Sequence, residues 1–164
     1  MAQPFPNHPN LRGGFAPLQM ECDVNDLVIE GEIPRALNGS FYRNGPNPQY
    51  APRGHYHWFG GDGMVHAFHV EDGRVAYRNR WVRTIKWQKE REAGRSLFSA
   101  FNPLDNDDSV AGLETDGVAN TNIIWHGGKL LALEEGHAPF ELDPHTLESI
   151  GPVSYTHLTL PTIR

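Results

Sequence analysis

The sequence is nearly free of cysteine, because Cys22 is the only one among 164 residues. A single thiol excludes an intrachain disulfide and any metal cluster built on several thiolates. No apolar run approaches the ~20 residues that a membrane-spanning helix needs, so no transmembrane segment is predicted. The first residues, MAQPFPNHPNLRGG, lack the basic stretch followed by an apolar one that defines a signal peptide. We therefore expect a cytoplasmic protein.

Basic residues are fewer than acidic ones. The chain carries 14 Lys and Arg against 20 Asp and Glu, and its net charge of −6 argues against a nucleic-acid partner. Basic side chains do gather between Arg74 and Arg95, but acidic and aromatic residues interrupt them. We interpret that stretch as a solvated face. The nucleophile motif GxSxG is absent, so nothing supports hydrolase chemistry.

Glycine and proline are abundant instead. The 17 glycines and 13 prolines favour turns and short strands over long helices. Asp72-Gly73 between two alternating segments is a strong hairpin signal, and Gly127-Gly128 provides a second one. Hairpins that recur without helices between them predict an all-β antiparallel fold, for which a propeller is one candidate. The predicted elements are an irregular arm (1–20), strands (40–43, 64–70, 74–84, 122–126, 129–133, 139–142) and one short helix (86–95).

Nine histidines raise the question of a metal site. His55 and His57 lie two apart, so on a strand both would point to one face and could chelate an ion. The alternative, which we prefer, is a pair of loop histidines without a completing ligand. Asp62 is close in sequence, but GGDG is typical of a turn whose Asp bonds its own backbone. Five aromatic residues are interpreted as core, with an apolar tunnel as the alternative: Trp58, Phe59, Trp81, Trp87 and Phe98.

Four segments together resemble a known family. LNGSFYRNGPNP, GGDGMVHAF, RNRWVRT and ALEEGHAPFELDPHTLESIG occur in this order across residues 27–151. In order and spacing they resemble the N-terminal part of the carotenoid cleavage oxygenases. The resemblance implies the incomplete N-terminal portion of a seven-bladed β-propeller. Its Fe(II) would be held by four histidines, none of which matches a histidine here. We therefore expect the iron ligands downstream of this chain and no catalysis by the chain alone.

The resemblance assigns a role to one residue. In the family, a glutamate before an LDPxTLE turn accepts a hydrogen bond from an iron-ligating histidine. LALEEGHAPFELDPHTLE places Glu135 at that position, with Glu134 as the second choice. Such a carboxylate fixes the tautomer and angle of the imidazole and raises its basicity. The alternative from the residues alone is that the two glutamates form a solvated pair at a strand end.

The implied activity is cleavage of a conjugated carbon–carbon double bond of a carotenoid or apocarotenoid with O2, which yields two carbonyl products. The partners would be a hydrophobic small molecule and O2, and the intact enzyme could contact a membrane peripherally. Lignostilbene-cleaving members are the alternative. They tend to carry a lysine before the glutamate and a tyrosine upstream, where this sequence has Glu134 and Phe101. A third hypothesis is a propeller that binds a partner without catalysis.

The last residues suggest a different origin. VSYTHLTLPT can be back-translated into a string that resembles a sequencing adapter, so we interpret residues 153–164 as a non-native tail. The alternative is a native strand, because Val, Tyr and Thr favour strands. The predicted organisation is thus an arm (1–20), part of a propeller (21–152) and the tail (153–164).

Overall fold

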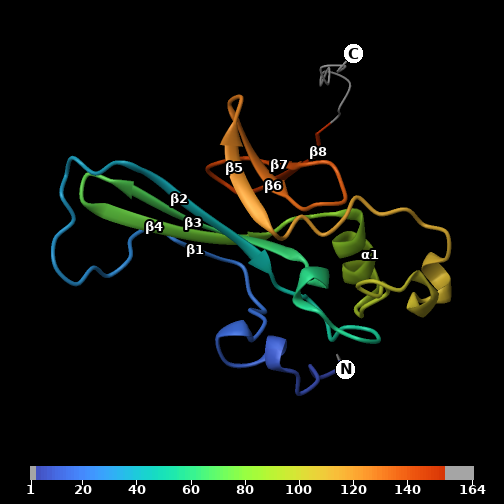
Figure 1. The fold of residues 1–164 in the computed structure, drawn as a ribbon. Coiled ribbons are helices and arrows are strands. Elements are labelled where there is room, and N and C mark those ends of the chain that lie inside the picture. Colours follow the sequence, from blue (N-terminus) through green and yellow to red (C-terminus); the bar gives the residue numbers. More distant parts are fainter. Residues whose placement is uncertain (1–2, 154–164) are drawn as a thin grey trace, which may run out of the picture.

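The computed structural model describes residues 3–153, so the predicted tail lies outside the described residues from position 154 onward. Two four-stranded antiparallel sheets make up most of the fold (Figure 1). The first has the order β1-β4-β3-β2 and the second the order β5-β6-β7-β8. Their strands are β1 (Cys22–Val24), β2 (Gly39–Pro46), β3 (Gly63–Glu71), β4 (Arg74–Trp81), β5 (Asn122–His126), β6 (Lys129–Leu133), β7 (Phe140–Leu142) and β8 (Ser149–Pro152).

Helical structure is short throughout the described range. The one α-helix there is α1 (Ile85–Ala93), and no helix is long and apolar enough to cross a bilayer. Figure 1 shows α1 and the loop that follows it at one end of the first sheet, beside the second sheet. Five single turns of 3-10 helix occur in the connections: η1 (Pro9–Leu11), η2 (Gly13–Phe15), η3 (Trp58–Gly60), η4 (Pro103–Asp105) and η5 (Asp108–Val110).

The hairpin turns follow from their residues. Asp72 and Gly73 both have positive φ, 45° and 76°, and Glu71 pairs with Arg74 across them. Gly127 and Gly128 have φ of 58° and 78° between paired residues 126 and 129. Two successive residues with positive φ form the turn whose twist matches antiparallel strands. Both predicted hairpins are therefore confirmed.

Helix α1 begins and ends at recognisable caps. The Thr84 hydroxyl accepts a hydrogen bond from the Trp87 backbone N–H at 3.2 Å, and Gly94 ends the helix with φ of 68°. The strand predicted over 74–84 therefore stops at Trp81, because Thr84 serves the helix instead. The helix itself begins one residue before its predicted start and ends two residues before its predicted end.

The two sheets share one hydrophobic core. Val65 and Ala67 of β3 pack against Leu130 and Ala132 of β6, together with Phe140 and Leu142 of β7. Polar contacts reinforce this junction. The Asn44 side-chain amide donates to the carbonyls of Ala119 and Asn122, at 2.8 and 3.0 Å. The Gly63 N–H donates to the Val118 carbonyl at 2.8 Å. The chain between the sheets is thereby held against β2 and β3.

Close packing explains the glycine at position 63. A Cβ built there would overlap the backbone carbonyl of Ala119, so no larger residue fits without separating the sheets. Gly63 does not have positive φ, so close approach rather than turn geometry selects glycine. The prediction that the GGDG glycines serve tight turns is wrong at this position.

Most arginines of strand β4 and of the residues after it form ion pairs with acidic side chains. Arg80 contacts Asp23 at 2.6 Å, Arg83 contacts Glu21 at 2.6 Å and Arg74 contacts Asp26 at 2.9 Å. These acids lie in or beside β1, which pairs with β4. The interpretation of this basic stretch as a solvated face therefore needs a correction, since acidic side chains of the preceding segment cover part of it.

Candidate functional site

A cavity of about 390 Å³ opens where β6 ends near α1 and the following loop. This volume falls within the range of small-molecule sites. Four parts of the chain line it: η3, the start of α1, residues 98–118 and the turn after β6. Its apolar lining includes Phe59, Phe98, Phe101 and Leu113, and its ionisable lining consists of Lys86, Glu134, Glu135 and His137.

Glu134 and His137 form a pair in this cavity. The His137 Nδ1 contacts a carboxylate oxygen of Glu134, and the Glu134 side chain is only 13% exposed. Gly117 makes room for them, because a Cβ there would overlap both side chains. Its φ of 87° also favours glycine. Residues far apart in sequence thus hold the pair at the cavity wall.

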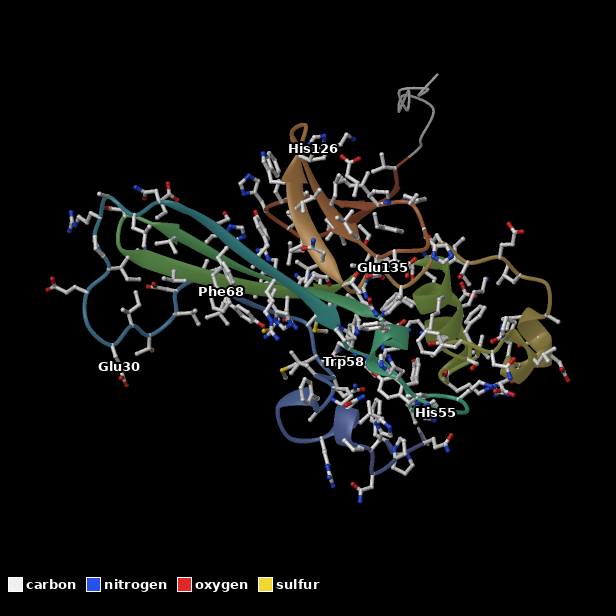
Figure 2. All side chains as sticks on the ribbon, viewed as in Figure 1. Glu30, His55, Trp58, Phe68, His126 and Glu135 are labelled. Atoms are coloured by element: carbon white, nitrogen blue, oxygen red, sulfur yellow. The ribbon has the colours of Figure 1, made fainter. Side chains whose placement is uncertain are left out.

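Glu135, the residue predicted to support an iron ligand, also lines the cavity. Figure 2 shows it where the second sheet approaches α1, whereas His126 lies at the far tip of the β5–β6 hairpin. Glu135 is exposed, and its carboxylate makes no hydrogen bond or ion pair within residues 3–153. An unengaged carboxylate at a cavity wall can accept a hydrogen bond from an imidazole supplied by another part of the protein.

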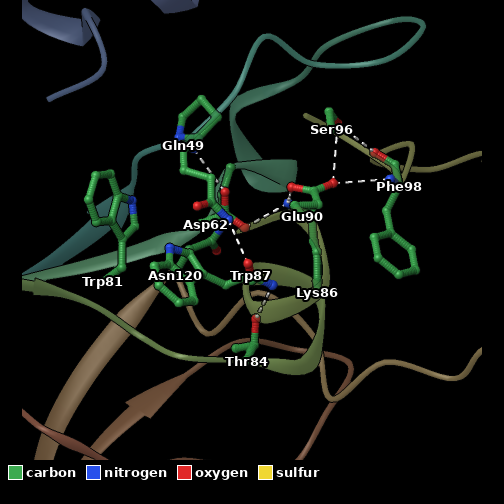
Figure 3. A network of polar contacts seen from close by, with 12 residues as sticks. Gln49, Asp62, Trp81, Thr84, Lys86, Trp87, Glu90, Ser96, Phe98 and Asn120 are labelled. Atoms are coloured by element: carbon green, nitrogen blue, oxygen red, sulfur yellow. Dashed lines mark hydrogen bonds and ion pairs between the residues drawn. The ribbon is translucent and has the colours of Figure 1, made fainter. Parts of the chain in front are cut away.

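A buried ion network centred on Lys86 adjoins the cavity, because Lys86 is also part of the cavity lining (Figure 3). The Lys86 ammonium contacts Asp62 at 2.6 Å and Glu90 at 3.0 Å. Burial by itself would lower the pKa of Lys86, but the two carboxylates outweigh it and raise the pKa above its ordinary value. Burial, helped by the charge of Asp62, likewise raises the pKa of Tyr56 to about 12. The Lys86 ammonium therefore stays charged between Asp62 and Glu90.

Asp62 corrects one prediction. Its carboxylate does not bond its own turn but accepts from Lys86 and, at 3.1 Å, from the Gln49 backbone N–H. Glu90 completes the network by accepting from the backbone N–H groups of Leu97 and Phe98 at 2.8 and 3.0 Å. The network thus fixes the backbone that carries Phe98 into the cavity. Sequence reasoning missed it, although Lys86 and Glu90 have the i, i+4 spacing of a helical ion pair.

A second ionic contact holds the loop over the cavity. Asp107 contacts Arg53 at 3.2 Å and also Arg95, while its own loop donates from Ser109. The hydrogen bonds from Arg95 and Ser109 keep the pKa of Asp107 well below its usual range. The carboxylate is therefore ionised at neutral pH and tethers residues 99–113 to two separate segments.

The histidines serve local roles where the structure describes their contacts. His57 accepts from the Phe59 N–H at 3.2 Å and caps η3, and His66 lies 2.7 Å from the Tyr77 hydroxyl. Within residues 3–153, no three His, Cys, Asp or Glu side chains lie close enough to hold one metal ion. These residues therefore do not make an iron site by themselves, and downstream iron ligands stay a prediction.

The five aromatic residues divide between two environments. Trp81 and Trp87 pack with Met64 in a buried cluster, as core interpretation predicts. Phe98 is also core, in a cluster with Leu97 and Val110, and one side of it faces the cavity. Phe59 is 51% exposed and lines the cavity together with Phe101, so the core interpretation is wrong for Phe59. The tunnel alternative therefore fits part of the set, and the ring stack of Trp58 on Phe59 extends that aromatic surface.

Comparison with known proteins gives a consistent picture. A family model described as "RPE65: Retinal pigment epithelial membrane protein" matches residues 15–162. The isoeugenol monooxygenase of Pseudomonas nitroreducens is 48% identical over 94% of this chain, which covers 32% of that protein. Lignostilbene-alpha,beta-dioxygenase isozyme III of Sphingomonas paucimobilis is 46% identical over 90% of the chain and 30% of its own length. Carotenoid 9,10(9',10')-cleavage dioxygenase 1 of Phaseolus vulgaris is 35% identical over 90% of the chain and 31% of its own length.

Solved structures match in the same way. A lignostilbene dioxygenase of Pseudomonas brassicacearum has a TM-score of 0.87 and 40% identity over 94% of this chain and 32% of its own. A cobalt-substituted Synechocystis structure of the apocarotenoid oxygenase has a TM-score of 0.69 and 36% identity over 84% of this chain and 30% of its own. The chain thus spans about a third of the length of the proteins that it matches.

Proposed function

Since the chain belongs to the RPE65 family of oxygenases, which includes the carotenoid cleavage enzymes, we propose that the whole protein cleaves a carbon–carbon double bond with O2. Each alkene carbon would gain one oxygen atom, so that one alkene and one O2 give two carbonyl products. The cavity that Phe59, Phe98 and Phe101 line supports a hydrophobic substrate. We further propose that the two sheets are the first portion of a propeller that the rest of the protein closes.

The substrate class we favour is an aryl alkene, such as a hydroxyphenylpropene or a stilbene. The observation that carries this choice is sequence identity, which is 46–49% with enzymes named for isoeugenol and lignostilbene and 35% with a carotenoid dioxygenase. A carotenoid or apocarotenoid is the second candidate. Glu134 and Phe101 favour it, because the stilbene-cleaving members that the family resemblance describes have a lysine and a tyrosine there.

Iron(II) is the cofactor that the family resemblance implies, and its redox chemistry with O2 would be supplied by parts of the protein beyond this chain. The present residues contribute the cavity wall and one carboxylate. Glu135 fits the role of hydrogen-bond acceptor for an iron-ligating imidazole, because its carboxylate is exposed at the cavity and unengaged within the described residues.

The test is an assay of the whole protein, expressed with iron from the recovered gene. Isoeugenol, a hydroxystilbene and an apocarotenal are each supplied with O2, and the carbonyl products are identified by mass spectrometry with 18O2. We expect label in the aldehydes and the highest kcat/KM for an aryl alkene. Faster turnover of the apocarotenal would replace the substrate class. No cleavage of any alkene and no bound iron would instead support a non-catalytic binding module.

A further inference from the structure

The two sheets also meet at a pair of histidines outside the cavity lining. His69 of β3 and His145 of the turn between β7 and β8 have ring centroids 6.1 Å apart, with the ring planes inclined by 34°. Neither residue lines the cavity, and neither takes part in the proposed oxygenase chemistry. The pair is therefore free to serve a separate purpose.

Hydrogen bonds hold the turn that carries His145 against the first sheet. The Tyr42 hydroxyl of β2 donates to the Pro144 carbonyl at 2.8 Å, and Arg78 of β4 donates to the His145 carbonyl. Within the turn, the Asp143 carboxylate accepts from the His145 backbone N–H at 2.9 Å. The backbone that carries His145 is thus fixed relative to the first sheet, so the two rings meet in a defined place.

One nitrogen of His69 is held and the other is not. Its Nδ1 lies 2.7 Å from the Ser40 hydroxyl, whereas its Nε2 is buried and has no hydrogen-bond partner within residues 3–153. A buried polar atom without a partner is unusual in a folded protein, because it costs free energy. The Ser40 hydroxyl can accept the Nδ1 proton, which leaves a lone pair on Nε2. Metal-binding histidines have this arrangement, since they donate the proton of their second nitrogen to a nearby oxygen.

We propose that His69 and His145 bind one divalent transition-metal ion of the zinc class, which joins the first sheet to the second. Imidazole nitrogen suits zinc, copper and nickel, whereas magnesium and calcium prefer oxygen ligands. Two Zn–N bonds of about 2.0–2.1 Å, each extended to its ring centre, span a distance close to the 6.1 Å between the ring centroids. His145 is exposed, so its ring can turn towards the ion, and water can fill the remaining ligand positions.

The charges around the pair allow a cation there. Burial lowers the pKa of His69, and the positive charges of His145 and Arg78 lower it further, so the ring is neutral at pH 7. Neutral imidazole is the form that binds a metal ion. Arg78 by itself would repel a cation, but Asp23 contacts its guanidinium and the Asp143 carboxylate lies in the adjoining turn. Negative charge therefore accompanies the positive charge of Arg78.

The first experiment titrates zinc chloride into the chelator-treated whole protein at pH 7.5 and measures the heat of binding. We expect the native protein to bind one zinc ion more than His69→Gln or His145→Gln. Zinc bound at an iron site elsewhere in the protein contributes equally to all three and cancels in this difference. His126→Gln is the matched control, because His126 is an exposed histidine at the tip of the β5–β6 hairpin. Native zinc stoichiometry in His69→Gln and His145→Gln would overturn the proposal.

Ser40 provides a graded test of the same site. Ser40→Ala removes the oxygen that holds Nδ1 of His69, and loss of such a partner typically weakens metal binding by about ten- to a hundredfold. Ser40→Thr keeps a hydroxyl and should restore most of the affinity. A merely structural serine would not produce this order of zinc affinities, so equal affinities in the two variants would contradict its assigned role and the proposed site.

The second experiment needs no variant. Diethyl pyrocarbonate acylates the free nitrogens of neutral histidines, and the modified peptides of the native whole protein are quantified by mass spectrometry. His145 should react without zinc and be protected by zinc, with half-protection at the zinc concentration that half-fills the site. His126 should react equally in both samples. Continued reaction of His145 at saturating zinc would overturn the site even if the substitutions prevented folding.

A stability measurement tests whether the ion joins the sheets. An ion that binds only the folded arrangement stabilises it, so zinc should raise the thermal midpoint of the native whole protein and of His126→Gln, but have a smaller effect on His145→Gln. Equal effects of zinc in all three would overturn the joining role. The zinc site and the oxygenase activity are tested by separate readouts. A protein that cleaves no alkene but shows the expected zinc difference keeps the zinc site, and an active enzyme without that difference loses only the zinc site.

Discussion

Glu135 and Glu134 are adjacent in sequence but differ in their surroundings. Glu134 is paired with His137, whereas Glu135 is exposed on the cavity wall and has no partner within the described residues. The sequence alone could not separate them, because both follow a strand and both are glutamates. The family resemblance selected Glu135, and the pairing of Glu134 leaves Glu135 as the carboxylate still available to an outside imidazole.

Replacing Glu135 by Gln in the whole protein tests that role. An amide oxygen accepts a weaker hydrogen bond than a carboxylate, so the iron-ligating histidine would be less basic and less well oriented. We expect iron occupancy after dialysis and kcat/KM both to fall about ten- to a hundredfold. Glu148→Gln, an exposed carboxylate away from the cavity, is the control. Unaltered iron content and turnover in Glu135→Gln would show that another residue supports the histidine.

Lys86 carries a prediction about stability. Lys86→Met keeps much of the side-chain length but leaves Asp62 and Glu90 as unpaired buried anions. Loss of one partner from a buried pair is strongly destabilising, by about 3–5 kcal/mol. We expect a loss of this size in the free energy of unfolding of the whole protein, measured with urea. The exposed pair of Lys89 and Glu92 offers the matched control, because Lys89→Met should change the free energy by less than about 1 kcal/mol.

Lys86 also determines how the free energy of unfolding depends on pH. The pKa of Lys86 in the folded protein is raised above the 10.5 of the unfolded chain. Its stabilising contribution is therefore fully present below that pH and is lost as the pH rises towards the folded pKa. The difference between native protein and Lys86→Met should thus stay constant through neutral pH. A difference that is absent at neutral pH would contradict the ion pairing.

At the scale of elements, the sequence predicted the hairpins correctly because a turn depends on only a few neighbouring residues. Asp72-Gly73 and Gly127-Gly128 located their hairpins because positive φ at two successive residues is a property of the turn itself. Strand β1 was missed because its three residues pair with β4 across a long sequence separation, as in Cys22 with Asn79.

The cavity was beyond local prediction for the same reason. It combines η3, the start of α1, a long loop and the turn after β6, and only the packing of the two sheets brings these together. Asp62 illustrates the difficulty. In sequence it belongs to a glycine-rich turn, yet its partners are Lys86 on α1 and the backbone of Gln49. The role of a residue whose partners are distant in sequence cannot be predicted from the residues next to it.

Gly63 gives a prediction at the element scale. Gly63→Ala places a methyl group against the Ala119 carbonyl, where the backbone linking the sheets approaches β3. Overpacking of this kind typically destabilises by about 1–3 kcal/mol. We expect a lower urea midpoint for the whole protein. Gly45→Ala on the neighbouring strand β2 is the matched control, because a Cβ there meets no atom within 4 Å. Equal effects of the two substitutions would show that close packing at Gly63 is not limiting.

At the scale of the whole molecule, the described residues leave large apolar side chains uncovered. Phe41 on the edge strand β2 is 61% exposed and Trp125 on the edge strand β5 is 60% exposed, while Val28 and Leu104 are almost fully exposed. Unpaired strand edges beside apolar surface promote association between chains. In proteins about three times as long, further chain is available to cover such surface.

This surface predicts how residues 1–164 behave when they are expressed alone. We expect association or a broad, weakly cooperative thermal transition, together with binding of a dye that reports exposed apolar surface. The whole protein should show a sharp transition and little dye binding, because burial of Phe41 and Trp125 removes the surface concerned. Phe41→Ser with Trp125→Ser should reduce association of the short chain, measured by size-exclusion chromatography. A monomer of residues 1–164 with a sharp melt would show that the two sheets form a complete folding unit, and the propeller proposal would then lose its main structural support.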